Sequence, residues 1–334
     1  MIEKECLSVV RKIDWESQIG RRLKLRDLHV FMTVAQRGSM AKAAEQLGVS
    51  ASAVSEVISD LEHTLGIRLL DRNPQGIEPN AYGRALLKRC TAAFDELKQG
   101  INDLEFLADP GLGEVRIGCS DSIAAALQPV IERFSKLYPR IVLQICHSAS
   151  PTLELPQLRD RHVDLCLVRS RKFQTDAYAD LMVEVLFHEE SLVVAGKQSR
   201  WATRPQIDLA ELVNEPWILA SSDSQVHSNL AAAFRARGLQ MPRASLMTYS
   251  VHLRTSLVAT GDFITALPGS ILRFNPNQFS LKVLPIELPG PPWPVAVVTL
   301  KNRTLSPVVQ LFVDHVRAFT TSMGAEAASE KKLA

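Results

Sequence analysis

Three short helical periods lie between Leu28 and Leu61, and the turns that join them are too short for any one period to fold alone. The third period has two unlike faces. Its apolar stripe, at i, i+4, i+7 and i+11, consists of Val54, Ile58, Leu61 and Leu65. Its polar face, at i, i+3, i+4 and i+7, consists of Ser52, Ser55, Glu56 and Ser59. The polar face is too small to pack a core, and its shape suits the major groove of DNA.

The two preceding periods fit the same arrangement. Gly38 is placed to end the first helix, Ser39 can cap the second, and Ser50 can cap the third. Small Ala43 and Ala44 let two helices cross closely, as a helix-turn-helix requires. The periodicity alone fits equally well an ordinary three-helix packing unit that does not bind DNA.

After the third helix the chain reads IRLLDRNPQGIEPNAYG, which predicts strands at 68–71 and 76–79 with a turn between them. This is a β wing, and it places Arg68 and Arg72 beside the groove, where they can touch the sugar-phosphate backbone. For Arg68, a solvated hairpin position is an equally good interpretation. Asn80 should cap a long helix that runs to about Leu107.

An apolar stripe that repeats at eleven residues follows this long helix, which should be roughly 40 Å in length. Its members are Leu86, Cys90, Ala93, Leu97, Ile101, Leu104 and Ala108. A stripe of this length between domains needs a partner, and we expect the same helix of a second subunit. Residues 109–113 then form a linker.

From residue 114 the pattern changes to alternating strands and helices, which predicts largely parallel sheets covered on both faces. Strands are expected at 115–119, 141–146, 164–168, 181–187, 191–195, 217–220, 244–248, 263–266 and 295–299. Helices are expected at 122–137, 152–162, 224–237, 251–260 and 307–320. Roughly 210 residues suit two α/β subdomains with a ligand cleft at their junction.

Strand ends should supply the ligand contacts in such a cleft. The candidate effector-binding residues are Ser120, Ser122, Ser148, Arg169, Ser221 and Thr248. Plain helix capping is the alternative for Ser120 and Ser122. Arg169 either pairs with an anionic effector or is a solvated loop arginine. No catalytic constellation appears, and no metal or cofactor site is expected.

Composition and charge limit the class of protein that this sequence can be. The 334 residues are 46% hydrophobic and 22% charged, as in an ordinary soluble protein of two or three domains. No apolar run is long enough to span a membrane and no secretory signal is evident, so we expect a cytoplasmic protein without a membrane partner. Residues 20–90 carry 11 Lys and Arg against 7 Asp and Glu, a net charge of +4 on the segment that should meet phosphates.

One stretch, MAKAAEQLGVSASAVSEVISDLEHTLGIRLLDR, closely resembles the DNA-binding segment of LysR-type transcriptional regulators. The resemblance extends over about residues 23–320. It implies that Lys42 and Arg72 occupy the family's basic positions. It also implies a bilobed domain of the type 2 periplasmic-binding-protein kind, with the chain leaving lobe one near 189–191 and returning near 289–293. Two positions depart from the family pattern, because many relatives carry glutamine at Ala51 and arginine at Glu56.

The expected organisation is therefore a winged helix-turn-helix at 23–80, a dimerisation helix and hinge at 81–113, and a bilobed effector domain at 114–322. Lobe one comprises 114–189 and 290–322, lobe two comprises 190–289, and 323–334 is a disordered tail. The DNA contacts expected are Lys42, Ser50, Ser52, Ser55, Glu56, Arg68 and Arg72. The implied function is an effector-responsive regulator that binds double-stranded DNA as a homodimer or homotetramer. A ligand-independent architectural DNA binder and a solute-binding protein or enzyme are the alternatives.

The five cysteines, at 6, 90, 119, 146 and 166, form no CxxC or metal-ligand cluster. Free buried thiols in a reducing cytoplasm are expected. A redox-sensing pair is the alternative. Some relatives sense peroxide through two cysteines in the later half of the effector region, and this chain has none after Cys166.

Overall fold

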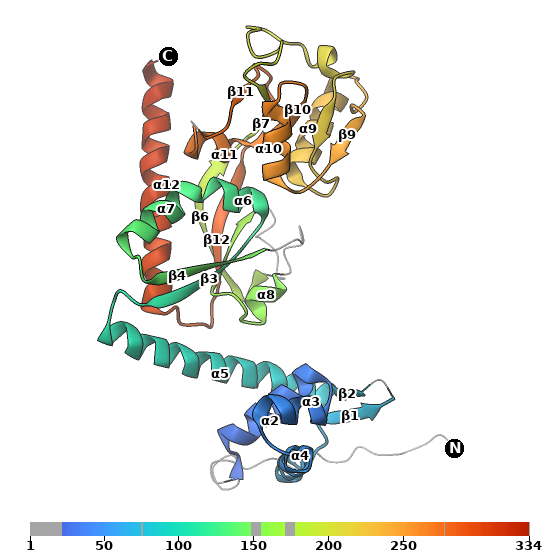
Figure 1. Ribbon diagram of the computed structural model, residues 1–334, viewed down its shortest axis with the longest axis vertical. Coiled ribbons are helices and arrows are strands. Elements are labelled where there is room, and N and C mark those ends of the chain that lie inside the picture. The colour runs from blue at the N-terminus through green and yellow to red at the C-terminus, as the bar shows by residue number, and fades with distance from the viewer. Residues whose placement is uncertain (1–21, 75, 148–154, 171–177, 277, 334) are drawn as a thin grey trace. The chain divides into compact units, whose positions relative to one another are not determined.

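The computed structural model describes residues 22–74, 76–147, 155–170, 178–276 and 278–333. The chain divides into two compact units, the first ending at Lys98 and the second beginning at Gln99 (Figure 1). In the described part of the chain, no helix is both long and apolar enough to cross a membrane.

The first unit contains the expected three helices. They are α2 (Leu25–Arg37), α3 (Met40–Leu47) and α4 (Ala51–Leu65). Gly38 ends α2 with a φ of 65°, a left-handed conformation that a residue without a Cβ adopts freely. The predicted apolar faces meet in one core, in which Phe31 and Ala43 are fully buried. Ser39 occupies the N-cap position of α3, but among the described residues its side chain makes no capping hydrogen bond, contrary to the capping role we predicted.

The wing follows as strands β1 (Leu70–Asn73) and β2 (Gly76–Pro79), paired antiparallel with Leu70 opposite Pro79. The first strand begins two residues later than predicted, so Arg68 precedes it. Helix α5 (Ala81–Ala108) then begins as predicted, with the Asn80 Oδ1 atom accepting a hydrogen bond of 2.9 Å from the Gly83 amide.

The second unit contains two five-stranded sheets, one in each lobe. The order in lobe one is β4 (Ile141–His147), β3 (Gly113–Cys119), β5 (Leu165–Arg169), β12 (Trp293–Leu300), β6 (Leu181–Glu189). The order in lobe two is β11 (Leu281–Val283), β7 (Ser191–Gly196), β10 (Ile264–Pro268), β8 (Trp217–Leu219), β9 (Ala244–Met247). The chain passes from the first sheet to the second at residue 190 and returns between 283 and 293.

Both sheets are mixed, so the expectation of largely parallel sheets was wrong. Strand β3 pairs parallel with β4 and β5, whereas β12 runs antiparallel to both β5 and β6. In lobe two, β7 runs antiparallel to β10 and β11. Strands β6 and β7, which carry the chain from lobe one to lobe two, are among the antiparallel strands. They follow each other directly, without the crossover helix that usually connects parallel strands.

Three of the predicted helices differ from those observed. The helix expected at 122–137 is two helices, α6 (Asp121–Ala126) and α7 (Gln128–Leu137). Of the one expected at 152–162, only α8 (Pro156–Arg159) is observed, and its predicted first residues lie outside the described part. Helix α12 runs from Pro307 to Leu333, so the stretch expected to be a disordered tail continues the last helix. Its sequence is rich in Ala, Glu and Lys, which favour helix.

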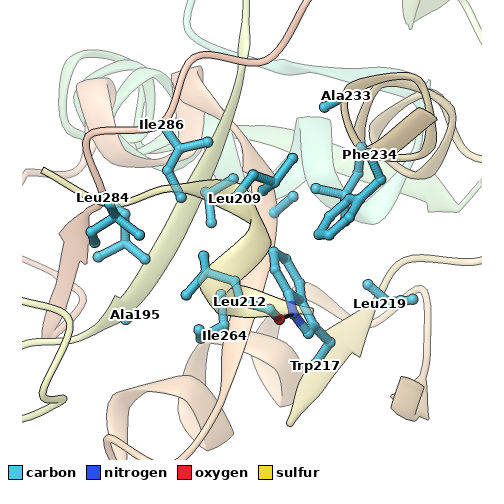
Figure 2. Close-up of a cluster of buried hydrophobic side chains, with 14 of the residues drawn as sticks. Ala195, Leu209, Leu212, Trp217, Leu219, Ala233, Phe234, Ile264, Leu284 and Ile286 are labelled. Carbon is cyan, nitrogen blue, oxygen red and sulfur yellow. Dashed lines mark hydrogen bonds between the residues drawn. The ribbon is translucent and has the colours of Figure 1, made fainter. Parts of the chain in front are cut away.

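The remaining helical elements belong to lobe two. They are η3 (Leu209–Leu212), α9 (Gln225–Ala236), α10 (Val251–Ala259) and α11 (Gly269–Phe274). Elements η3 and α11, with strand β11, were not predicted. Figure 2 shows the core that η3 helps to close, where Trp217 meets Phe234 edge-on at 5.9 Å between ring centroids. The buried Trp217 indole donates a hydrogen bond of 2.7 Å to the Leu212 carbonyl, so the ring nitrogen is satisfied inside the apolar cluster.

Candidate DNA-binding surface and effector site

The N-terminus of α4 carries the residues predicted to read DNA. Ser50 is its N-cap, and the Ser50 Oγ atom accepts a hydrogen bond of 3.2 Å from the Ala53 amide. The same Oγ lies 2.9 Å from that of Ser52. Ser50 therefore has a structural role in starting the helix, whatever it contacts on DNA.

The polar face of α4 is open to solvent, as its sequence predicted. Ser52 and Glu56 are exposed and Ser55 is half-buried, whereas Val54 and Ile58 on the opposite side are buried. Side chains this short let a helix approach base edges closely. The basic residues predicted to meet phosphates, Lys42, Arg68 and Arg72, are all exposed.

The wing is held to the three-helix core by two contacts. The Glu62 Oε1 atom, from α4, accepts hydrogen bonds from the Leu69 amide at 2.7 Å and the Leu70 amide at 3.2 Å. At the other strand, the Ile77 amide donates to the Gly38 carbonyl at 2.9 Å. A Cβ on Gly76 would lie 2.7 Å from that carbonyl oxygen, so this close approach requires glycine. Glu62 was not predicted as a site residue, because its partners are set by the tertiary fold.

In lobe one, the predicted effector residues gather at the ends of β3 and β5. The Ser120 and Ser122 hydroxyls lie 3.2 Å apart, and Ser122 Oγ accepts a hydrogen bond of 3.4 Å from Arg169 Nη1. Ser120 occupies the N-cap position of α6, yet within the described chain its side chain makes no capping bond, so simple capping does not explain that hydroxyl. Ser148 lies outside the described residues.

Arg169 is not the solvated loop arginine that the sequence allowed. Its side chain is 11% exposed and forms an ion pair with Glu189, whose side chain is 1% exposed. Glu189 also accepts hydrogen bonds from the amide and hydroxyl of Ser270 in lobe two. The charge of Arg169 is thus already matched inside the protein.

Two further hydrogen bonds cross between the lobes at the same place. The Asp121 Oδ2 atom accepts a bond of 2.6 Å from the Val251 amide, which caps α10 from the neighbouring lobe. The Gln225 Nε2 atom, at the start of α9, donates a bond of 3.0 Å to the Arg169 carbonyl. Three elements of the two lobes, α6, α9 and α10, therefore begin around one polar cluster.

The two lobe-two candidates are less central to this cluster. Thr248 Oγ1 accepts a bond of 3.1 Å from the Ser250 amide, one residue before α10 begins. Tyr249 donates a hydrogen bond to Asp223, and this bond lowers the pKa of Asp223 and raises the pKa of Tyr249, while the Ser221 hydroxyl lowers the pKa of both. Both Asp223 and Tyr249 are exposed.

Arg254 is a site residue that the sequence analysis missed. It lies on α10, is 3% exposed, and donates a bond of 3.1 Å from Nη1 to the Ala266 carbonyl. The pKa of Arg254 is lowered to about 10, chiefly because burial disfavours the charged form; the negative charge of Asp121 raises this pKa and the positive charge of Arg169 lowers it. The guanidinium remains charged at neutral pH. The sequence does contain a sign of this role, because an arginine stands in the buried stripe of Val251, Thr255 and Val258.

The described cysteines are free thiols, and Cys6 lies outside the described residues. Burial raises the pKa of Cys119 and Cys166 to about 12 each and the pKa of Cys90 to about 11. A buried thiol with so high a pKa is a poor nucleophile. This chemistry disfavours the redox-sensing alternative for these three residues.

Comparisons with known proteins bear on both units. Residues 25–84 match the bacterial regulatory helix-turn-helix proteins of the lysR family, and residues 108–320 match the LysR substrate binding domain. The transcriptional regulator TdcA of Escherichia coli is 29% identical over 306 residues, which cover 90% of this chain and 95% of TdcA. GbpR of Azospirillum brasilense is 27% identical, with 89% of this chain and 86% of GbpR covered.

Solved structures share the fold. A full-length variant of OxyR from Pseudomonas aeruginosa gives a TM-score of 0.60 at 20% identity, covering 88% of this chain and 95% of that one. Full-length CbnR in complex with its target DNA gives 0.58 at 20% identity, covering 89% and 99%. With its helix-turn-helix followed by a two-lobed substrate-binding domain, this chain belongs to the LysR family of transcriptional regulators.

Proposed function

We propose that this regulator binds double-stranded DNA through the α4 face and the wing, and that a small molecule bound between its two lobes controls its action. The observation that carries the sensing part is the set of hydrogen bonds crossing the lobes from Asp121, Gln225 and Glu189. A ligand that inserts among them changes the relative free energies of two lobe arrangements. As a DNA-binding regulator, it acts in the cytoplasm and not as an enzyme.

In the proposed DNA complex, Ser52, Ser55 and Glu56 read base edges while Lys42 and Arg72 hold phosphates. This assignment is supported by their accessibility on one unit, where Ser55 is half-buried and the other four residues are exposed. Arg68, which precedes the wing strand, is a further phosphate contact. Glu56 can accept a hydrogen bond from a cytosine amino group, so the preferred operator should differ from that of relatives with arginine there.

We further propose that the protein acts as a homodimer or homotetramer held through α5. Four large apolar residues on this helix are exposed by 49%, 58%, 67% and 77%: Leu97, Ile101, Leu104 and Leu107. Such a stripe is costly in water, and the matching stripe of a second copy covers it. The other end of the predicted stripe differs, because Cys90 is buried in the core of its own subunit.

The test has two steps. The full-length protein is first used to select fragments from a genomic DNA pool, and the retained sequences should share a pseudo-palindrome with half-sites about one helical turn apart. A small-molecule library is then screened by thermal shift, and each hit is tested for its effect on operator binding. Hits that stabilise the protein and change DNA binding support sensing. A library-wide absence of hits, with normal DNA binding, supports the architectural alternative.

A further inference from the structure

Three buried side-chain atoms in the polar cluster between the lobes have no hydrogen-bond partner among the described residues. They are Arg169 Nη2, Arg254 Nε and Gln225 Oε1. Two are donors that belong to guanidinium groups and one is an amide acceptor. A buried polar atom without a partner costs free energy, so a cluster of three calls for a physical cause.

The three atoms belong to one network. Gln225 is bonded to Arg169 through the 3.0 Å contact between its Nε2 atom and the Arg169 carbonyl. Arg254 lies one helical turn after Val251, whose amide is bonded to Asp121, and its charge interacts with those of Asp121 and Arg169. The residues that carry the two unpartnered donors and the unpartnered acceptor therefore belong to the network at the start of α6, α9 and α10.

The charges of this network already balance. Arg169 is paired with Glu189, and the acid whose charge acts on Arg254 is Asp121. A ligand with a single negative charge would leave one charge uncompensated where solvent is largely excluded, which is unfavourable. A ligand that carries one positive and one negative group supplies the missing acceptors and donor without disturbing the balance.

We propose that this site, whose sensing role rests on the function proposed above, takes a small zwitterion, most simply a free α-amino acid. Its carboxylate accepts hydrogen bonds from Arg169 Nη2 and Arg254 Nε. Its ammonium group donates to Gln225 Oε1. The ligand satisfies all three atoms and ties α9 and α10 of lobe two to β5 of lobe one, which is the contact that effector binding must alter.

The experiment measures binding to the full-length protein by thermal shift and calorimetry. The probes are the twenty common amino acids, each compared with the analogue that lacks the amino group and the amine that lacks the carboxyl group. At least one amino acid should bind, and both of its truncated analogues should bind at least about tenfold more weakly, since each loses a charged hydrogen bond.

Two variants locate the site. Arg254→Met should weaken binding of that amino acid by roughly ten- to a hundredfold, whereas Arg243→Met, at an exposed lobe-two arginine, should not change it. Gln225→Met keeps the side-chain length and tests recognition of the ammonium group. In this variant the preference for the amino acid over its deaminated analogue should disappear, a change that loss of structure alone does not produce. If Arg254→Met fails to fold, Gln225→Met still tests whether the amino acid binds at this site.

Two results would overturn the proposal. If none of the twenty amino acids binds while a compound of another class binds and alters DNA affinity, the zwitterion is wrong but sensing stands. If an amino acid binds with its preference unchanged in both variants, the ligand lies elsewhere. An absence of binding by every class of compound counts against the sensing function itself.

Discussion

Replacing Glu62 with alanine should loosen the wing without removing any residue that touches DNA. One carboxylate oxygen accepts from the amides of Leu69 and Leu70, at 2.7 and 3.2 Å. A hydrogen bond to a charged acceptor contributes about 1.5–3 kcal/mol, and the second bond is longer and shares the same oxygen. Glu62→Ala should therefore destabilise this part of the wing by about 2–4 kcal/mol. Glu62→Gln keeps an acceptor oxygen and should cost much less.

Hydrogen exchange followed by mass spectrometry of the full-length protein measures this directly. A loss of about 2 kcal/mol corresponds to about thirtyfold faster exchange of the Leu69 and Leu70 amides. DNA affinity should fall as well, because Arg72 is carried by the strand that begins there. Glu45→Ala, at an exposed position on α3, is the control. If both amides exchange at the wild-type rate in Glu62→Ala, the carboxylate does not hold the wing and our reasoning is wrong.

Four other predictions follow from the same structure. Arg72→Ala should weaken binding to all DNA sequences alike and reduce the salt slope by about 0.9, in titrations at several salt concentrations; a change at one base pair only would contradict it. Ser55→Ala should alter the operator sequence recovered in a binding selection more than it alters non-specific affinity. Leu97→Glu should shift the full-length protein toward monomer in light scattering, because a charge would be buried at the seam. Cys119 and Cys166 should resist iodoacetamide at about pH 8, since pKa values of about 12 keep both thiols protonated until the chain unfolds; rapid alkylation of the folded protein would refute this.

The elements that the sequence predicts well are those fixed by local periodicity. The stripe of α4 and the caps at Ser50 and Asn80 required only residues within a few positions of each other. The break between α6 and α7 was not predicted. It had a local sign, because proline is common in the first turn of a helix and Pro129 stands in the first turn of α7. The antiparallel direction of β12 could not be read locally, since it depends on the chain returning from lobe two.

The candidate site residues also divide into those that local sequence predicts and those that depend on the tertiary fold. Exposure of Lys42 and Arg72 was predictable, because both stand outside the apolar stripes of their unit. The effector cluster was only half predictable. Ser122 and Arg169 were expected at strand ends, whereas the partner of Arg169 is Glu189, twenty residues further along the chain. Arg169 and Glu189 end two strands of the lobe-one sheet that lie on either side of β12, so this pairing is set by the strand order, and the local sequence carries no sign of it.

The junction of the lobes combines two chemically different contacts. One is apolar, where Phe274 of lobe two meets Phe187 at 5.2 Å and Phe319 at 5.7 Å, both edge-on. It is non-directional and strongly favoured by burial, so the lobes lose much free energy if it opens. The other is the polar cluster, whose bonds depend on direction and leave atoms of Arg254 and Gln225 unsatisfied by any described residue. Because each lobe also has a core of its own, a small molecule can act on the polar contact while the apolar contact keeps the lobes together.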